Sequence, residues 1–503
     1  MERIKAFIEL LFIPFLLFSS AGLADASANI SIEEAGPRPT QCITYDSTQK
    51  LIKVRCDSIH LTDIYKSLND SKVLTIEDKN KVSTDDDERP KVWILNAGVV
   101  IEKESSLIID SSDTAWLKIT ATPTIQIKKK LFNATEESNY SDDTVIKNST
   151  KAQIVNRTVE MENGIIIVSK HNGDNPNGIH VHGSLKIDSV KITSWDPDKN
   201  DVIRFEFGKR AGEEHTKSDY DTAEARGFIR VSKDATGTTN ITNSEIAYLG
   251  YSCSRCAGLS YYGGEGSVVK DSNIHHLLKG FYSKNAGHIV IDGNKFHNNY
   301  LYGIDPHTGS HDLNITNNLV YNNNASGIIC SKDCYSLLIA GNEVYNNAGA
   351  ARGIAFSINT TNSIAKNNNV HDQPRCISFN RESNHNQVYD NTLSNCKTGI
   401  YLSGTGNNSI YNNDISSSQY GIHLMNQNNS IYNNKIYDSK NGIVFEPLTS
   451  NESGIAITNT NQPSMLTEVD HDEYLAKIAA ENIIINTQNP TNLKKSASNS
   501  TKA

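Results

Sequence analysis

From about residue 227 onward, the apolar residues of this chain recur with a regular period. A glycine followed by a large apolar residue returns every 21 to 26 residues, and Cys376-Ile377 fills one of the places. The glycines are Gly258, Gly280, Gly303, Gly327, Gly353, Gly399, Gly421 and Gly442. Between them lies a second phrase with an isoleucine three positions before an asparagine, as in Ile315-Thr-Asn-Asn318. A repeat of this length is typical of a solenoid.

The residue types within the repeat indicate which kind of solenoid it is. The segments are rich in Ile, Val, Tyr, Asn and Gly, and they show no apolar stripe with a 3.6-residue period. The L-x-x-L-x-L frame of leucine-rich repeats is also absent. Asparagine tolerates left-handed backbone angles and can stack in hydrogen-bonded ladders. We therefore predict an all-β fold, a right-handed parallel β-helix with three short strands per turn, over residues 156–450.

The segments outside the repeat are predicted to have other roles. Residues 1–28 have the charged start, the apolar run and the small-residue cleavage sites of a secretory signal peptide. Residues 29–155 are predicted to form a small β-rich N-terminal region, and the charged stretch 196–226 a long loop. Residues 451–503 should provide a C-terminal cap and a disordered tail. A helix is expected over residues 473–482, either capping the column or detached from it.

Cysteine usage and charge limit the compartment and the partners. The eight cysteines form local pairs, which in an exported chain predict disulfides. A redox or half zinc site at Cys253-x-x-Cys256 is the alternative. N-x-S/T sequons also suit export and glycosylation. The formal charge of −9 argues against nucleic acid as a partner. We expect a secreted, cell-surface or periplasmic monomer with no membrane span in the mature chain.

Stacked coils place equivalent residues in rows with a spacing of roughly 4.8 Å, so the repeat register predicts which side chains meet. The central coils collect cations around one tyrosine, one aspartate and one histidine, and the outer coils lack this set. The cluster comprises Lys279, Lys284, Tyr302, Asp305, His307, Lys332, Arg352, Arg375 and Arg381. An acidic protein that binds a polyanion must gather its cations locally in this way.

Such a cluster fits chemistry on the sugar acids of an anionic polysaccharide. The C5 proton of a uronate is weakly acidic, and its removal needs a base together with a cation that neutralises the carboxylate. Histidine suits the base because it titrates near neutral pH. Return of a proton to the opposite face gives epimerisation, whereas loss of the C4 oxygen gives β-elimination. The cluster alone does not separate these two outcomes.

The phrase Tyr302-Gly303-Ile304-Asp305-Pro306-His307 resembles the mannuronan C5-epimerases, which convert mannuronate to guluronate within alginate. The resemblance covers roughly residues 160 to 445 and is specific around the Asp-Pro-His core. It implies that His307 is the main acid/base residue, that Tyr302 is a second proton-handling group, and that Asp305 orients the site. Substrate-binding cations would be Arg352, Lys332, Lys279 and Lys284.

The chain departs from the family pattern at two of these positions. Lys332 stands where periplasmic members have arginine, so the charge is kept but the bidentate fork is lost. Thr308 stands where they have an acidic residue. Some members need calcium and others do not, so the resemblance implies no required cofactor and allows Ca²⁺. No residue set is predicted to hold a metal.

Other interpretations of the same residues stay open at this point. A polysaccharide lyase could use His307 and Tyr302 for elimination, and a non-catalytic solenoid could bind glycans at its surface. Tyr420 occupies the register of Tyr302 in a coil without other site residues, which favours simple packing for tyrosine there. Asp305 precedes a proline and could serve only to start a turn.

Overall fold

The computed structural model describes residues 42–77, 89–120, 177–204, 225–251, 255–347, 352–425, 428–446 and 468–493. It also describes the backbone of a short antiparallel pair, β8 (Ile154–Val155) and β9 (Thr158–Val159). The predicted signal peptide, the C-terminal tail beyond residue 493 and residues 205–224 of the predicted loop lie outside these ranges.

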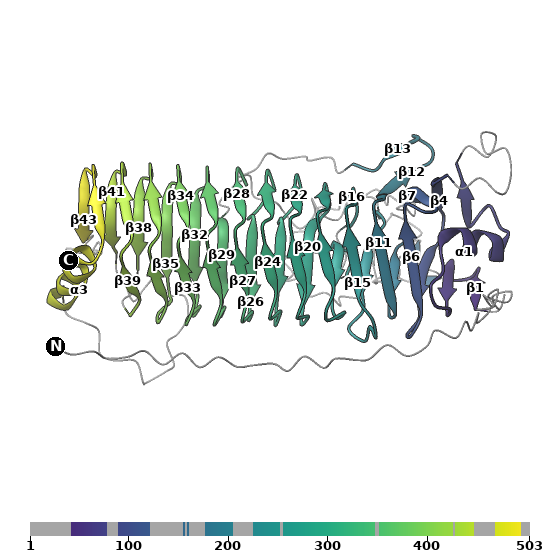
Figure 1. Ribbon diagram of the computed structural model, residues 1–503, viewed down its shortest axis with the longest axis horizontal. Helices are drawn as coiled ribbons and strands as arrows, with labels where there is room; N and C mark the ends of the chain where they lie inside the picture. Colours follow the sequence, from purple (N-terminus) through teal and green to yellow (C-terminus); the bar gives the residue numbers. More distant parts are fainter. Residues whose placement is uncertain are drawn as a thin grey trace, which may run out of the picture. The chain divides into compact units, whose positions relative to one another are not determined.

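Three sheets, called A, B and C here, run side by side, and most coils contribute one strand to each in that order (Figure 1). Sheet A contains β1 (Ile43–Asp46), β2 (Leu51–Val54), β5 (Gly98–Ile101), β10 (Ile179–Val181), β14 (Ile229–Val231), β17 (Gly258–Tyr261), β20 (Lys279–Lys284), β23 (Ile304–His307), β26 (Ile328–Lys332), β29 (Arg352–Ile358), β32 (Arg375–Asn380), β35 (Thr398–Ser403), β38 (Tyr420–Leu424), β41 (Asn441–Phe445) and β43 (Asn489–Leu493). Sheet B contains β6 (Ser106–Asp110), β11 (Ser184–Asp188), β15 (Thr239–Thr242), β18 (Val268–Lys270), β21 (Val290–Asp292), β24 (Asn314–Thr316), β27 (Leu338–Ala340), β30 (Ile364–Lys366), β33 (Gln387–Tyr389), β36 (Ser409–Tyr411) and β39 (Ser430–Tyr432). Sheet C contains β3 (Leu74–Ile76), β4 (Lys91–Leu95), β7 (Thr114–Thr120), β12 (Lys191–Asp196), β16 (Glu245–Ala247), β19 (Asn273–His275), β22 (Lys295–His297), β25 (Leu319–Tyr321), β28 (Glu343–Tyr345), β31 (Asn369–His371), β34 (Thr392–Ser394), β37 (Asp414–Ser416), β40 (Lys435–Tyr437) and β42 (Ile483–Ile485), and β13 (Asp201–Val202) pairs with β12.

Pairing between successive coils is parallel, so the predicted β-helix is confirmed. In a typical three-residue strand the middle side chain points inward, as Ile315 does in β24 and Val320 in β25, and both are fully buried. Glycine recurs at this position of the repeat because the neighbouring coil leaves no room for a side chain. A Cβ at Gly303 would lie 2.5 Å from Val320 Cγ1 and 2.8 Å from the carbonyl oxygen of Gly327. Only glycine therefore lets the strand enter the core so closely.

Asparagines form the ladders that the repeat predicted. Asn294, Asn318 and Asn342 occupy equivalent turns, and the amide oxygens of Asn318 and Asn342 accept hydrogen bonds from the backbone and side-chain nitrogens of the asparagine one coil earlier, at 2.9 to 3.0 Å. The same contact continues from Asn342 through Asn368 to Asn391. These side chains are buried, so the ladder satisfies polar groups that would otherwise be costly inside the column.

Both ends of the solenoid carry a helix. Near the N-terminal end, α1 (Leu61–Leu68) buries Leu61 and Ile64. At the other end, α3 (Glu468–Ala480) corresponds to the predicted helix, and its Leu475 and Ile478 are buried in the core. The helix therefore packs on the column. Neither described helix is long and apolar enough to cross a membrane.

The solenoid begins earlier in the chain than the predicted boundary at residue 156. Five strands between residues 51 and 120 already pair in parallel within the three sheets. In sheet A, β2 pairs with β5 and β5 with β10. In sheet B, β6 pairs with β11, and in sheet C, β4 pairs with β7 and β7 with β12. Residues 42–120 of the predicted β-rich region are therefore coils of the same column, with antiparallel strands β1 and β3 at its start.

The predicted disulfides Cys42–Cys56, Cys330–Cys334 and Cys376–Cys396 are present. Cys256 is also disulfide-bonded, and its predicted partner Cys253 lies outside the described residues. No described cysteine is free. Bonded cysteines are typical of a location outside the reducing cytoplasm.

Candidate active site

The predicted cluster lies on sheet A, where strands β20, β23 and β26 come from three successive coils. The parallel register sets Tyr282 beside Asp305 and Lys284 beside His307. Ile304 and Ile328 are both buried and pair with each other, which sets the register between β23 and β26. The register therefore brings together residues that are more than twenty positions apart in the chain.

Asp305 anchors the three coils. Its carboxylate is fully buried. Oδ2 lies 2.9 Å from Lys279 Nζ, and Oδ1 accepts a 2.6 Å hydrogen bond from the Ser331 hydroxyl. Charge-assisted bonds of this kind compensate the desolvation of a buried carboxylate. With both oxygens engaged, Asp305 is suited to the predicted orienting role and not to that of a base.

Lys279, predicted among the substrate-binding cations, directs its ammonium group to Asp305. The same nitrogen lies 4.3 Å from the ring centroid of Tyr282 and 5.6 Å from that of Tyr302. These distances are those of cation–π contacts. Lys279 therefore links the carboxylate to both phenol rings of the cluster.

His307 ends strand β23 and is half-buried. Its Nδ1 lies 2.8 Å from Thr308 Oγ1 and accepts a contact from the Thr308 amide N–H at 2.9 Å. The Thr308 hydroxyl and amide together offer a partner to either neutral tautomer of the ring. The Ser310 hydroxyl donates to the carbonyl oxygen of His307 at 2.6 Å and lies 2.9 Å from the Ser283 hydroxyl. The backbone that carries the imidazole is thus fixed to the preceding coil.

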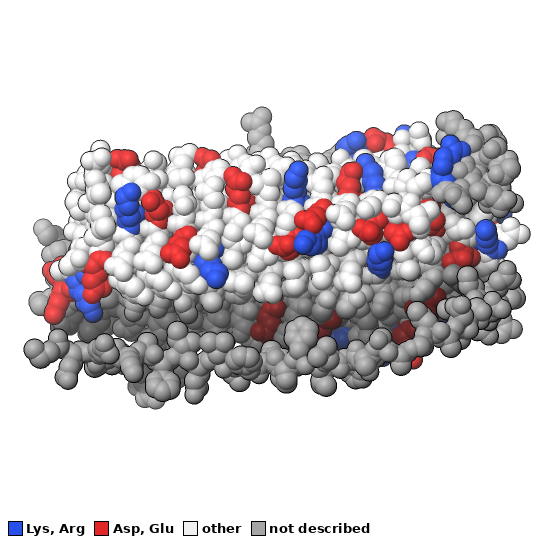
Figure 2. Space-filling model, in the orientation of Figure 1, with Lys and Arg blue, Asp and Glu red and all other residues white. Residues whose placement is uncertain are grey.

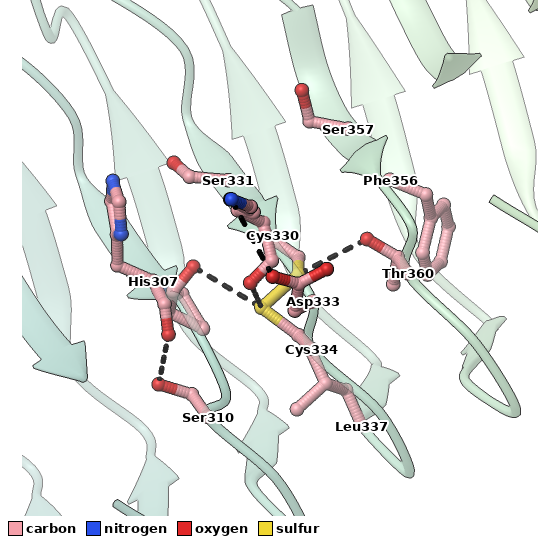
Figure 3. The surroundings of a disulfide bond; sticks show 12 residues. His307, Ser310, Cys330, Ser331, Asp333, Cys334, Leu337, Phe356, Ser357 and Thr360 are labelled. Carbon is pink, nitrogen blue, oxygen red and sulfur yellow. Dashed lines mark hydrogen bonds and ion pairs between the residues drawn. A yellow bond between two sulfur atoms is a disulfide. The ribbon is translucent and has the colours of Figure 1, made fainter. Parts of the chain in front are cut away.

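The imidazole extends outward from the sheet. Figure 3 shows His307, Ser331 and Ser357, which come from three successive strands of sheet A, extending away from the Cys330–Cys334 disulfide on the core side. The Tyr282 ring lies beside the imidazole, with 5.6 Å between the ring centroids. One side of the imidazole therefore packs against the protein.

The electrostatic surroundings favour the neutral form of His307. Burial lowers its pKa below the ordinary value, and the charges of Lys279, Lys284 and Lys332 lower it further, whereas Asp305 acts in the opposite direction. The imidazole is therefore unprotonated at neutral pH, which is the form that a general base requires.

Two guanidinium groups lie beyond this group, Arg352 on the next coil and Arg375 on the one after it. Arg352 pairs in register with Arg375, and burial together with the charge of Arg375 lowers its pKa. Among the described residues, the buried Nε of Arg352 has no hydrogen-bond partner. This nitrogen is shielded from solvent, so an anionic ligand would meet the terminal nitrogens of the guanidinium and not Nε. Tyr302 is near enough to Arg352 to act on it electrostatically, in the direction that raises the pKa of Arg352.

Of the remaining predicted cations, Lys284, Lys332 and Arg381 are exposed, whereas Arg375 is half-buried like Arg352. Lys284 is exposed at the end of β20, and Lys332 lies 3.8 Å from Asp333 at the surface. Arg375 places its guanidinium 3.8 Å from the ring centroid of Tyr401. Figure 2 shows that on the face it displays, acidic and basic side chains alternate without a field of one sign. That face therefore offers no continuous cationic track for a polyanion.

Three residues of the site received no role from the sequence: Tyr282, Thr308 and Ser331. The register carries a signal for Tyr282, because it occupies in its coil the position of Asp305. Burial raises the pKa of Tyr282, so its phenol keeps its proton. Ser331 and Thr308 act through hydroxyl contacts whose directions the repeat pattern does not encode.

Comparisons with known proteins agree with this architecture. The family described as "Right handed beta helix region" matches residues 229–393, and that described as "Periplasmic copper-binding protein (NosD)" matches residues 331–467. The structure of the periplasmic alginate epimerase AlgG aligns over 88% of this chain and 85% of its own, with a TM-score of 0.54 and 16% identity. This chain is thus a right-handed parallel β-helix protein.

Curated sequences point to one group among such proteins. A mannuronan C5-epimerase of Pseudomonas fluorescens is 30% identical over 150 residues, which are 27% of this chain and 25% of that enzyme. One of Pseudomonas aeruginosa is 36% identical over 90 residues, which are 16% of this chain and 17% of that enzyme. The matches thus span a quarter or less of these relatives. The chain is related, at low identity, to the mannuronan C5-epimerases.

Proposed function

We propose that this protein is a mannuronan C5-epimerase that converts β-D-mannuronate to α-L-guluronate within an alginate-like polyuronate. The observation that carries the proposal is the state of His307. It is a half-buried, outward-directed imidazole, and burial and three lysines hold its pKa below the ordinary value. The low-identity relationship to mannuronan C5-epimerases supports the same assignment.

In the proposed reaction, His307 removes the proton from C5 of a mannuronate unit. When Nδ1–H donates to Thr308 Oγ1, Nε2 carries the lone pair that accepts this proton. The electron pair left on C5 spreads onto the adjacent carboxylate, where a nearby cation stabilises it. Lys332, whose charge acts on His307, and Arg352, on the next coil, are assigned to this carboxylate.

A proton delivered to the opposite face of C5 completes the inversion. We assign this step to Tyr302, whose ring lies near the ammonium group of Lys279. Asp305 holds Lys279 in place, and the cation favours the phenolate that forms when Tyr302 gives up its proton. Lys284, beside His307 in the register, would bind a neighbouring carboxylate of the polymer.

We place this reaction outside the cytoplasm. The disulfides and the periplasmic relatives are compatible with action in the periplasm, at the cell surface or in the medium. The proposed protein acts as a monomer on an anionic polysaccharide, and its proton transfers use side chains alone, so calcium is not required for the chemical step.

The test is incubation of the protein with polymannuronate in deuterated water. Guluronate signals in the proton NMR spectrum, with deuterium at C5, are the expected result. Unsaturated chain ends that absorb in the ultraviolet would instead indicate a lyase, because elimination shares the first proton transfer. Tight binding of the polymer without either product would indicate a glycan-binding solenoid, and both of these outcomes contradict the proposal.

A further inference from the structure

A second group of side chains lies at the corner between sheets A and B, just after the strand that ends in His307. It consists of His288, His311 and Asp312, which come from two adjacent coils. One ligand atom from each residue lies within 4.8 Å of the others. His311 Nδ1 is 2.9 Å from Asp312 Oδ2, and His288 Nε2 is 4.0 Å from the same oxygen.

The imidazole of His311 lies in a slot that the neighbouring coils build for it. On one side is Gly287, where a Cβ would come within 2.2 Å of His311 Cε1 and 2.4 Å of its Nδ1. On the other side the Tyr335 ring stacks on it, with 4.9 Å between centroids and 9° between planes. The backbone angles of Gly287 do not themselves require glycine. The missing side chain at position 287 therefore makes room for this ring.

The backbone also directs the other two ligands toward the corner. His288 and Asp312 have left-handed φ angles of 54° and 50°, which non-glycine residues adopt at some cost. Gly287 and His311 are bridged in parallel register, so His288 and Asp312 occupy equivalent positions one coil apart. The coil spacing brings the two positions within reach of one ion.

We propose that His288, His311 and Asp312 form a binding site for a divalent transition-metal ion of the zinc type, linking two coils of the solenoid. Two imidazole nitrogens and one carboxylate are a frequent ligand set for Zn²⁺. The distances between the ligand atoms need only small side-chain rotations to enclose an ion that binds nitrogen and oxygen at about 2.0 to 2.2 Å. His288 is exposed, which leaves room for water at the remaining coordination position.

The ligand set separates this site from two others. Calcium takes six to eight oxygen ligands, so a site with two imidazoles selects against it. The stretch that matches the copper-binding family begins at residue 331 and does not include the three ligands. The site therefore rests on its own residues and is independent of the proposed epimerase activity.

Its position suggests what the ion would do. Ser310, which donates to the carbonyl oxygen of His307, directly precedes His311. A metal that fixes His311 and Asp312 to the preceding coil would therefore hold the turn that follows the proposed base. Metal binding at this corner adds to the stability of the folded chain, because the unfolded chain does not hold the three ligands together.

The test is isothermal titration of chelator-treated, tag-free full-length protein with ZnCl₂. The matched control is His385→Ala, because His385 is an exposed histidine with a left-handed φ of 56° in the equivalent corner of a later coil, away from the trio. His288→Ala and Asp312→Asn should each weaken Zn²⁺ binding at least roughly tenfold, since loss of an orienting partner alone costs that much. His385→Ala should bind like the unchanged protein, and Ca²⁺ should not compete.

A second variant tests the slot. Gly287→Ala keeps all three ligands but places a methyl group against the His311 ring, so it should weaken Zn²⁺ binding while the metal-free protein keeps its β-sheet circular dichroism. The proposal is overturned if no saturable Zn²⁺ binding occurs, or if His288→Ala and His385→Ala reduce it equally. These results concern metal binding alone, so they do not depend on whether the protein modifies polymannuronate.

Discussion

Lys279 Nζ and Asp305 Oδ2 lie 2.9 Å apart, although the two residues are 26 positions apart in the chain. They meet because strands β20 and β23 stack in parallel register. The carboxylate is fully buried, so the ion pair needs the Ser331 hydroxyl on the third coil to complete its hydrogen bonding. One buried carboxylate thus links the Lys279 ammonium, which lies beside both phenol rings, to the next coil.

Asp305→Asn should reduce both stability and activity. The substitution leaves the ammonium of Lys279 without its counter-charge in a buried place, which costs about 3 kcal/mol. Denaturant unfolding followed by circular dichroism measures this loss. Asp333→Asn is the matched control, because Asp333 pairs with Lys332 at the surface, and it should change stability by less than about 0.5 kcal/mol. Equal effects of the two variants would contradict the anchoring role of Asp305.

The pH dependence of turnover should report the cations around His307. The pKa of His307 lies below the ordinary value for histidine. As the pH is lowered, kcat/KM should therefore fall only near this lowered pKa, where the imidazole becomes protonated. Lys284→Ala and Lys332→Ala each remove a positive neighbour, so the pKa of His307 should rise and the acidic limb should move to higher pH. Lys435→Ala, on strand β40 of sheet C, should leave the limb in place. A limb that does not move in either site variant would separate His307 from the titrating group.

Thr308→Val should lower kcat while leaving KM nearly unchanged. Valine keeps the shape of threonine but removes the oxygen that can accept from Nδ1–H in the tautomer required of a base. The ring would then favour the tautomer whose Nδ1 accepts from the backbone amide. That tautomer has its proton on Nε2 and is not a base there. Steady-state kinetics on polymannuronate measure the effect, expected to be roughly tenfold or more. Thr308→Ser keeps the hydroxyl and should recover most of the activity; if it is as slow as Thr308→Val, the tautomer argument does not hold.

The asparagine ladder should contribute strongly to stability. In Asn318→Ala, Asn294 loses its acceptor and the carbonyl oxygen of Ile291 loses its donor, all in the core. A cost of about 3 kcal/mol is expected from buried polar groups left unsatisfied. Asn314→Ala, on the exposed start of the same coil's strand β24, should cost less than about 0.5 kcal/mol. Thermal unfolding of the two variants measures the difference, and similar transitions would argue against the ladder as a stabilising element.

The sequence predicted the fold in the coils where Gly303 and its equivalents mark each turn, because a side chain at Gly303 would collide with the neighbouring coil and glycine therefore recurs there, with Cys376 as the exception. It did not predict that residues 51–120 belong to the same column, because a single Gly-apolar pair, Gly98-Val99, occurs there and its equivalent Gly178-Ile179 follows only 80 residues later, outside the regular period. Backbone hydrogen bonds between strands do not require particular side chains, so such coils carry no recurring residue that the sequence could reveal.

The site was predicted in composition and only partly in geometry. The rows of equivalent positions placed Lys284 beside His307, as the register has them, and the cluster drawn from these rows contained both Lys279 and Asp305, which form an ion pair. They did not reveal that the Lys279 ammonium is held by a buried carboxylate while Lys284 stays exposed, because the rows fix the positions of the backbone and not the directions of the long side chains. The hydroxyl contacts of Ser331 and Thr308 likewise depend on side-chain directions that appear only in the folded chain.

Release of tritium from polymannuronate labelled at C5 measures the proposed proton abstraction most directly. The unchanged protein should transfer the label to water, and His307→Ala should do so at least about 100-fold more slowly, with an unaltered thermal transition. Release at the original rate by His307→Ala, or no release by the unchanged protein, would contradict the assignment of His307 as the base.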